Sequence, residues 1–355
     1  MRWLITNRNQ DSADGFGCDL ASLTYWTADP AATPGIDLTK RSAWTAVTAQ
    51  QFQDALVAVA SSFPSALNTS TADQRHVSVF VHGYNNNFIE STQRYQDIAA
   101  TLFDGPEGLG ELVSFDWPSK GSLLGYLPDR VMAKRVGDDL TNVLEALYDW
   151  MATKQVAATK NLDNACRART SLIAHSMGNY ALQYAMEALW TRKNRPLLVS
   201  LLQEVLMVAA DVDNDIFQDG EGVSDGGGEG LANLSYRITA LYTGRDDVLG
   251  SSAGLKHFGK RRLGRSGLDR TCAVSDNVWD VDCSSLLSPN VNGIAIHGEY
   301  FVPTETKLYT LMRRLLQGTD RSVLIAAGVV PPANPRMQAI GMPLPGPIGS
   351  GPAAR

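Results

Sequence analysis

The chain alternates between short apolar runs and longer segments in which apolar residues recur every three or four positions. The short runs are rich in β-branched residues and predict buried strands, whereas the spacing in the longer segments predicts amphipathic helices. This alternation is typical of a mostly parallel sheet with helices on both faces, an α/β fold. The expected strands are residues 76–82, 111–117, 170–175, 204–210 and 236–244, and the expected helices are 88–103, 129–152, 177–190 and 303–318.

Two segments break the alternation. Residues 331–355 contain seven of the 16 prolines and no apolar period, which predicts a flexible tail. Residues 219–230 are rich in glycine and acidic residues, which predicts a mobile surface loop. We therefore expect one domain over residues 1–330, in which residues 250–290 are a candidate cap or insertion.

Charge and composition exclude several classes of protein. The 37 acidic residues outnumber the 31 basic residues and leave a net charge of -6, which argues against nucleic acid or an anionic membrane as the main partner. The first residues lack the apolar run of about 7–15 positions that a signal peptide needs. No apolar stretch approaches the roughly 18 residues of a membrane span. The expectation is a cytoplasmic protein.

The four cysteines show no C-x-x-C spacing, so neither a disulfide scaffold nor a structural zinc site is expected. Free thiols are the favoured interpretation, and a bridge between Cys272 and Cys283 is the main alternative.

A candidate nucleophile follows the expected strand 170–175. The residues Ala174-His175-Ser176-Met177-Gly178 match the G-x-S-x-G elbow of α/β hydrolases, with alanine in place of the first glycine. Such a turn needs small residues two positions before and two positions after the serine, because the strand and helix backbones crowd there. The alternative for Ser176 is a simple helix N-cap.

Two N–H groups are expected to stabilise an oxyanion near this serine. One is that of Met177, directly after the serine. The other is that of Tyr84, in the loop after the strand that ends at His82, where Gly83 permits a close backbone approach. We expect His82 to brace that loop rather than to carry protons. His82, Trp117 and Trp279 are also candidates for the wall of a substrate pocket, although core packing is an equally good interpretation of Trp117.

The general base and the acid are expected later in the chain, because this fold supplies serine, acid and histidine in that order. Of the late histidines, His297 is favoured over His257 because it lies just before the last helix. Asp247, in the sequence Gly-Arg-Asp-Asp-Val after strand 236–244, is the favoured acid. Asp246 and Asp211 remain alternatives.

The acidic residues after strand 204–210 suggest an EF-hand loop, but Ile216 stands where that loop needs glycine and Gly222 where it needs glutamate. No metal site is therefore expected.

The motifs VFVHGYNNNF, FDWPSKG, Tyr126…Asp129, LIAHSMGN, AADVDNDIF and HGEYF together resemble a bacterial α/β-hydrolase family catalogued as a domain of unknown function, over roughly residues 50–317. The resemblance implies an esterase- or lipase-like enzyme with Ser176 as nucleophile, Asp247 as acid and His297 as base.

These observations predict a serine hydrolase that cleaves small carboxylic esters without a cofactor. An acyltransferase, a thioesterase or an amidase would use the same residues. A catalytically silent binding module with this fold is the alternative from another class.

Overall fold

The computed structural model describes residues 1–11, 14–65, 69–120, 126–161, 165–192, 200–218, 227–256, 259–271 and 273–330. Within them, nine strands form one sheet with the order β3-β2-β1-β5-β4-β6-β7-β8-β9. The strands are β1 (Arg2–Gln10), β2 (Phe16–Ala28), β3 (Thr45–Val47), β4 (His76–Val81), β5 (Gly110–Asp116), β6 (Arg169–His175), β7 (Leu202–Val208), β8 (Ser235–Tyr242) and β9 (Val278–Asp282).

The strands from β1 through β5, β4, β6, β7 and β8 to β9 run parallel, and β2 and β3 add an antiparallel edge beside β1. The five strands expected from the sequence are present with ends shifted by one or two residues. The three N-terminal strands and β9 were not anticipated. The predicted parallel sheet is confirmed, as is the α/β class.

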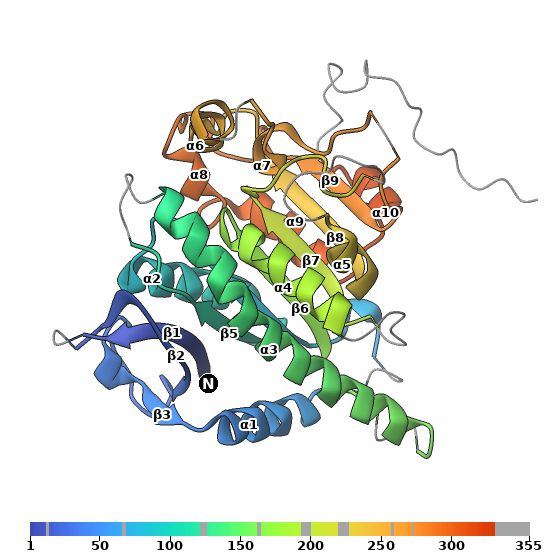
Figure 1. Cartoon of the computed structure of the whole chain (residues 1–355). Helices are drawn as coiled ribbons and strands as arrows, with labels where there is room; N and C mark the ends of the chain where they lie inside the picture. The colour runs from blue at the N-terminus through green and yellow to red at the C-terminus, as the bar shows by residue number, and fades with distance from the viewer. Residues whose placement is uncertain are drawn as a thin grey trace, which may run out of the picture.

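Helices cover both faces of the sheet (Figure 1). They are α1 (Ala49–Ser61), α2 (Phe88–Ile98), α3 (Tyr126–Ala158), α4 (Gly178–Arg192), α5 (Glu229–Leu234), α6 (Asp247–Ser251), α7 (Leu263–Ser266), α8 (Ile296–Glu299), α9 (Thr306–Leu316) and α10 (Arg321–Ala326). Short 3-10 turns occupy Arg41–Ala43 and Thr71–Asp73, and π-helical turns follow α2 at Ala99–Phe103 and α6 at Ser252–Lys256.

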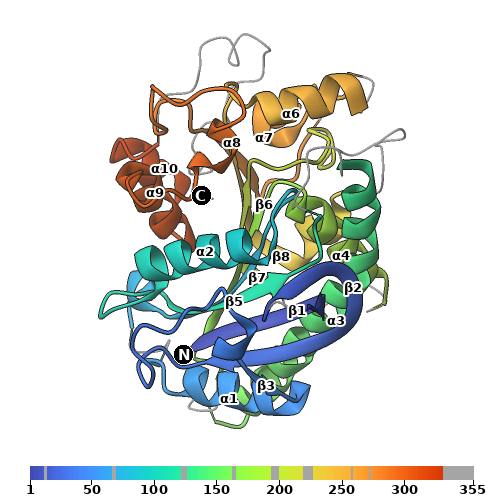
Figure 2. The ribbon, with the colours of Figure 1, turned by 90° about the vertical axis from the view of Figure 1, so that its left-hand side faces the viewer.

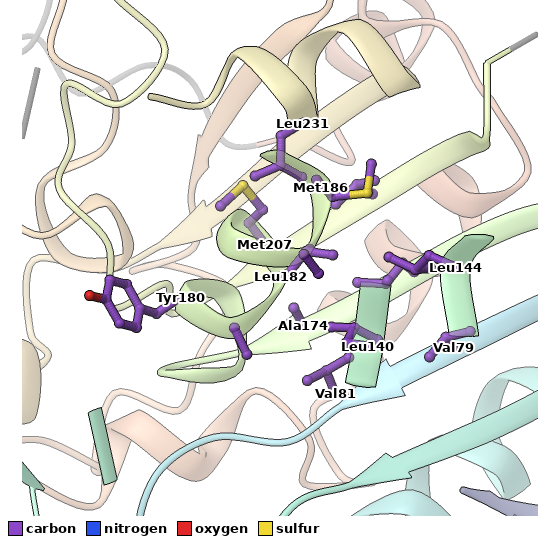
Figure 3. Packing of buried hydrophobic residues seen from close by; sticks show 14 of the residues in the cluster. Val79, Val81, Leu140, Leu144, Ala174, Tyr180, Leu182, Met186, Met207 and Leu231 are labelled. Carbon is purple, nitrogen blue, oxygen red and sulfur yellow. The ribbon is translucent and has the colours of Figure 1, made fainter. Parts of the chain in front are cut away.

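Strand β4 shows why the central strands are mostly apolar. All six of its residues are buried. Val79 and Val81 face the cluster formed with α3 and α4, whereas Phe80 faces the cluster formed with α2 and α9. Successive side chains point to opposite faces, so a strand covered on both faces is buried at every position. The two polar residues of β4, His76 and Ser78, both contact the Ser171 hydroxyl on the neighbouring β6. Figure 3 shows the α3–α4 side of this packing.

The helix starts follow local sequence. Thr48 caps α1 and Asn87 caps α2, each with a capping box that the third residue of the helix completes. The box at Asn87 begins α2 only a few residues after β4. This short connection keeps the loop after β4 beside the turn that carries Ser176.

Strand β9 lies within residues 250–290 and joins the sheet beside β8. The acidic loop residues 219–226 and the tail 331–355 lie outside the described residues. Cys283 is a buried free thiol, and Cys272, its partner in the alternative of a disulfide bridge, also lies outside them. No helix in the described ranges has both the length and the apolarity to cross a membrane.

Candidate functional site

Ser176 stands on a sharp turn between β6 and α4. Its φ of 52° lies in the left-handed region, which costs energy for a residue with a side chain. A Cβ on Gly178 would lie 2.5 Å from the carbonyl oxygen of His82, so the position two residues after the serine has no room for a side chain. The strand–turn–helix context expected for Ser176 is confirmed.

Hydrogen bonds hold this turn in its strained conformation. The backbone N–H of Ser176 donates to the Val208 carbonyl at 3.0 Å. The Asn179 side-chain amide donates to the carbonyl of Ala174 at 3.0 Å and to that of Ser176 at 3.2 Å. These bonds offset the backbone strain and fix the direction in which the serine hydroxyl points.

His297 meets the serine hydroxyl. Its Nε2 lies 2.8 Å from Ser176 Oγ, and its side chain is only 12% exposed. It comes from the single turn α8, which precedes α9 as the sequence suggested. The alternative histidine, His257, lies outside the described residues.

The carboxylate that His297 contacts belongs to Asp246 and not to the favoured Asp247. Asp246 Oδ2 lies 2.6 Å from His297 Nδ1, and the residue is fully buried. Asp247 points outward, with 62% of its side chain exposed and a contact to Arg265 Nη1 at 3.1 Å. The preference for Asp247 was wrong.

Local helix geometry explains this one-residue difference. Asp246 is the N-cap of α6, and its Oδ1 accepts the N–H of Leu249 at 3.0 Å. An N-cap side chain folds back over the start of its helix, whereas the next residue projects from the first turn. One oxygen of Asp246 therefore caps α6, and the other holds the imidazole.

Asp211, the second alternative acid, serves another network. Its Oδ2 accepts from the Tyr126 hydroxyl and its Oδ1 from the Ser252 hydroxyl, both at 2.8 Å. Burial alone would raise the pKa of Asp211, but the charges of Arg262 and Arg130, together with the two hydroxyl hydrogen bonds, outweigh it and the pKa is lowered. This carboxylate ties α3 to the segment after α6.

A second histidine, His175, supports the backbone of His297. His175 Nε2 lies 3.0 Å from the backbone carbonyl of His297, and its Nδ1 lies 3.2 Å from Arg94 Nη1. Burial, followed by the charge of Arg94, holds the pKa of His175 well below its usual value, so the ring is neutral. A neutral ring that accepts from Arg94 donates through Nε2 to His297. The sequence carried no signal for this role of Arg94.

A family model described as alpha/beta hydrolase of unknown function (DUF900) matches residues 59–278, which is more than half of the chain. The chain belongs to this family of α/β hydrolases. Ser176 and Asp246 lie within the matched segment, and His297 lies beyond it.

Comparison with solved structures finds matches of low identity and low TM-score. Acetylxylan esterase shares 10% identity over 68% of this chain and 99% of its own, with a TM-score of 0.29. A putative hydrolase of the alpha/beta superfamily from Xanthomonas campestris pv. campestris shares 13% over 69% and 99%, with a TM-score of 0.26. The Pyrobaculum calidifontis esterase shares 8% over 76% and 91%, with a TM-score of 0.32. No curated protein matches the sequence significantly.

In this α/β hydrolase, the loop after β4 approaches the serine very closely. A Cβ on Gly83 would lie 2.6 Å from Ser176 Cβ. On the other side of the serine, the Met177 N–H has no hydrogen-bond acceptor among the described residues. The backbones of residues 83–84 and of Met177 thus flank the serine, as an oxyanion site requires.

Gly83→Ala is expected to lower hydrolase activity by at least about 100-fold, because the new methyl group must displace the serine or the loop and disturb the reaction geometry. Gly244→Ala is the matched control, since a Cβ there meets nothing within 4 Å. Initial rates on one soluble ester, with circular dichroism to check folding, would measure both. Equal activity of the two variants would contradict the close approach.

His82 is a brace, as expected, and does not line a pocket. The residue is fully buried, and its Nδ1 lies 2.8 Å from the Gly83 carbonyl oxygen. Its ring stacks on that of Trp117, with centroids 5.2 Å apart and planes at 5°. Trp117 is also fully buried, and its indole N–H donates to the His82 carbonyl at 2.8 Å.

The assignment of His82 and Trp117 to a substrate pocket was therefore wrong, because both belong to the core. Trp279 also lies elsewhere: its ring is on β9 and packs beneath the Arg321 guanidinium, 5.3 Å from the ring centroid. It pairs with Thr239, well before the carboxyl end of the sheet.

A buried ion pair between β1 and β5 anchors the loop after β4. Arg8 Nε donates to Asp116 Oδ2 at 2.8 Å, and both side chains are almost fully buried. Arg8 also donates to the Asn86 carbonyl at 2.9 Å, and the Ser91 hydroxyl donates to Asp116 at 2.7 Å. Burial would raise the pKa of Asp116, but Arg8 and His82 together outweigh it and the pKa is lowered.

Asp116→Asn is expected to reduce the free energy of unfolding by about 3–5 kcal/mol, because it leaves the buried Arg8 charge uncompensated. Asp104→Asn is the matched control, because its carboxylate pairs with Arg2 at 40% exposure and should cost about 0–1 kcal/mol. Urea unfolding would measure both. Since the pKa of Asp116 is lowered, its contribution is complete above the ordinary carboxyl pKa of about 3.9 and is lost as pH falls through the lowered value. Equal losses in the two variants would refute this account.

The acidic residues after β7 are neutralised by Lys260 and Arg262, which come later in the chain. Arg262 is fully buried, and its Nη1 lies 2.6 Å from Asp213 Oδ1. Lys260 Nζ lies 3.6 Å from Asp215 Oδ2. Among the described residues, no cluster of acidic, histidine or cysteine side chains could hold a metal ion.

Proposed function

We propose that this α/β hydrolase cleaves carboxylic esters through a covalent acyl-enzyme intermediate on Ser176. One observation carries the proposal: a continuous line of hydrogen bonds runs from Asp246 through His297 to Ser176, with distances of 2.6 and 2.8 Å. It ends on a serine whose left-handed backbone holds the hydroxyl at the carboxyl edge of the sheet. Ligands bind beyond that edge in folds of this kind.

In the first half of the reaction, Ser176 Oγ attacks the ester carbonyl carbon while His297 Nε2 takes the hydroxyl proton. The carbonyl oxygen becomes an oxyanion, which the N–H groups of Met177 and Tyr84 stabilise. The imidazolium then gives its proton to the departing alcohol, and the C–O bond breaks to leave an acyl-serine.

In the second half, water replaces the alcohol. His297 takes a proton from the water as it attacks the acyl carbon, and then returns it to Ser176 Oγ as the carboxylic acid leaves. Asp246 holds Nδ1–H throughout, so that Nε2 is free to accept a proton. Its negative charge also stabilises the imidazolium in the buried site.

A fluorophosphonate probe tests the proposal directly, because it phosphonylates only an activated serine. We expect one label per chain on the tryptic peptide that contains Ser176, and turnover of p-nitrophenyl esters in a series from acetate to palmitate. The matched p-nitroanilides should react far more slowly. An unlabelled Ser176 in a folded protein would disprove the serine mechanism, and anilides that react faster than esters would make the enzyme an amidase.

A further inference from the structure

An apolar cavity lies between α1 and α3, against strands β1, β4 and β5. Its volume is about 120 Å³, and its walls include Phe52, Leu56, Val79, Val143 and Trp150. Among the fifteen described residues that line it, Gln53 has an amide side chain, and Tyr25 and Trp150 each carry one polar atom on an aromatic side chain. Such a cavity is comparable to the roughly 150 Å³ engineered cavity that stays dry and binds benzene.

This cavity is remote from the proposed active site. Figures 1 and 2 show α1 at the end of the molecule opposite α6 and α8. Along α3, Tyr126 contacts Asp211 near the serine, whereas Trp150 lies 24 residues further on, from 126 to 150. At about 1.5 Å per residue, this separation along the helix is roughly 36 Å. The cavity is therefore no part of the ester site.

The wall that contains Ala60 and Trp150, which we take as the mouth of the cavity, has a different chemistry. A second hollow of about 150 Å³ shares Ala60 and Trp150 with the first, and its other walls include Ser61, Lys154 and Arg167. The Trp150 indole nitrogen is buried at this junction and has no hydrogen-bond partner among the described residues. A buried N–H without an acceptor costs free energy unless a ligand supplies one.

We propose that the two hollows together bind a single-chain fatty carboxylate of about six to ten carbons. The hydrocarbon chain fills the apolar cavity between α1 and α3. The carboxylate lies at the mouth, where it accepts the Trp150 N–H and faces the positive charges of Lys154 and Arg167. An apolar cavity with one cationic end matches an anionic amphiphile in both shape and charge.

The size of the cavity sets the dependence on chain length. By comparison with the benzene-sized cavity, about six carbons fit inside the apolar cavity, and the remaining carbons lie in the second hollow. Each methylene that becomes buried should strengthen binding by about fourfold, and the gain should stop once both hollows are full. Hexanoate, octanoate and decanoate therefore form a graded series, with longer chains gaining little more.

Isothermal titration calorimetry on full-length Ser176→Ala protein tests this proposal without turnover. We expect one octanoate per chain, and at least about tenfold weaker binding of 1-octanol, which lacks the charge-assisted hydrogen bonds. Lys154→Met and Arg167→Met should weaken octanoate and leave octanol unchanged. Equal binding of octanoate and octanol would overturn the assignment of the carboxylate end.

A pair of substitutions on α3 locates the ligand. Val143→Trp fills the cavity and should weaken octanoate at least tenfold, whereas Val156→Trp, at a 63% exposed position outside the cavity, should have no effect. If Val143→Trp fails to fold, the Lys154→Met variant still decides the result, because its side chain lies at the mouth. Unchanged affinity in Val143→Trp would place the ligand elsewhere. If the protein sediments with anionic vesicles but does not bind octanoate, this face is a membrane contact and the proposal is refuted.

Discussion

Ser176→Ala is expected to abolish ester hydrolysis and to leave the fold intact. The hydroxyl is the proposed nucleophile, and removing a nucleophile of this kind lowers kcat by about 10⁶-fold. The Ser176 backbone hydrogen bond to Val208 does not involve the side chain, and alanine has the same Cβ at this φ of 52°. The turn should therefore persist, and the melting temperature should change little.

Rates on p-nitrophenyl butyrate and thermal unfolding by circular dichroism would measure the two effects separately. Ser322→Ala, at an exposed position on α10, is a matched control that should keep the full rate. More than about one per cent of wild-type activity in folded Ser176→Ala protein would show that another group attacks the ester.

Asp246→Asn is expected to lower kcat by up to about 10⁴-fold at neutral pH, because an amide in this place can favour the wrong imidazole tautomer. Asparagine caps helices about as well as aspartate, so the bond from the Leu249 N–H to this side chain can persist and α6 should remain folded. The loss should therefore appear in catalysis rather than in stability.

Asp247→Asn provides the adjacent control. Its carboxylate is mostly exposed and contacts only Arg265, so the substitution should change kcat by less than about threefold. Both variants should be assayed on the same ester at pH 7 to 8. A large loss in Asp247→Asn with retention in Asp246→Asn would reverse the structural assignment, and retention in both would remove the acid from the mechanism.

The sequence was sufficient wherever the signal is local. Strand β4 is apolar at four of its six positions because both of its faces are covered, and that pattern is visible without a structure. The turn at Ser176 was also predictable. The serine follows a strand and precedes a helix, and a small residue stands two positions before it and two positions after it. His297 could be selected because chain order in this fold places the base last.

The N-terminal strands show where local pattern fails. Strand β1 reads Arg-Trp-Leu-Ile-Thr-Asn-Arg-Asn-Gln, and its second half is polar. Arg8 is nevertheless buried, because Asp116, 108 residues later in the chain, compensates its charge. A single sequence does not reveal such a pairing, since the partner is brought close only by the sheet.

The sequence by itself determined the α/β fold and the order of the central strands along the chain, and it predicted Ser176 and His297 as the reactive pair. Only the tertiary structure decided which aspartate meets the histidine. Asp246 and Asp247 are neighbours of identical chemistry, and they differ in direction alone: the helix cap turns one inward to His297 and the first helical turn projects the other into solvent. Asp211 was likewise undecided until the fold placed Tyr126 and Ser252 against its two oxygens. Residue type and spacing specify what a group can do, whereas the direction of a side chain depends on contacts between segments that are distant in sequence.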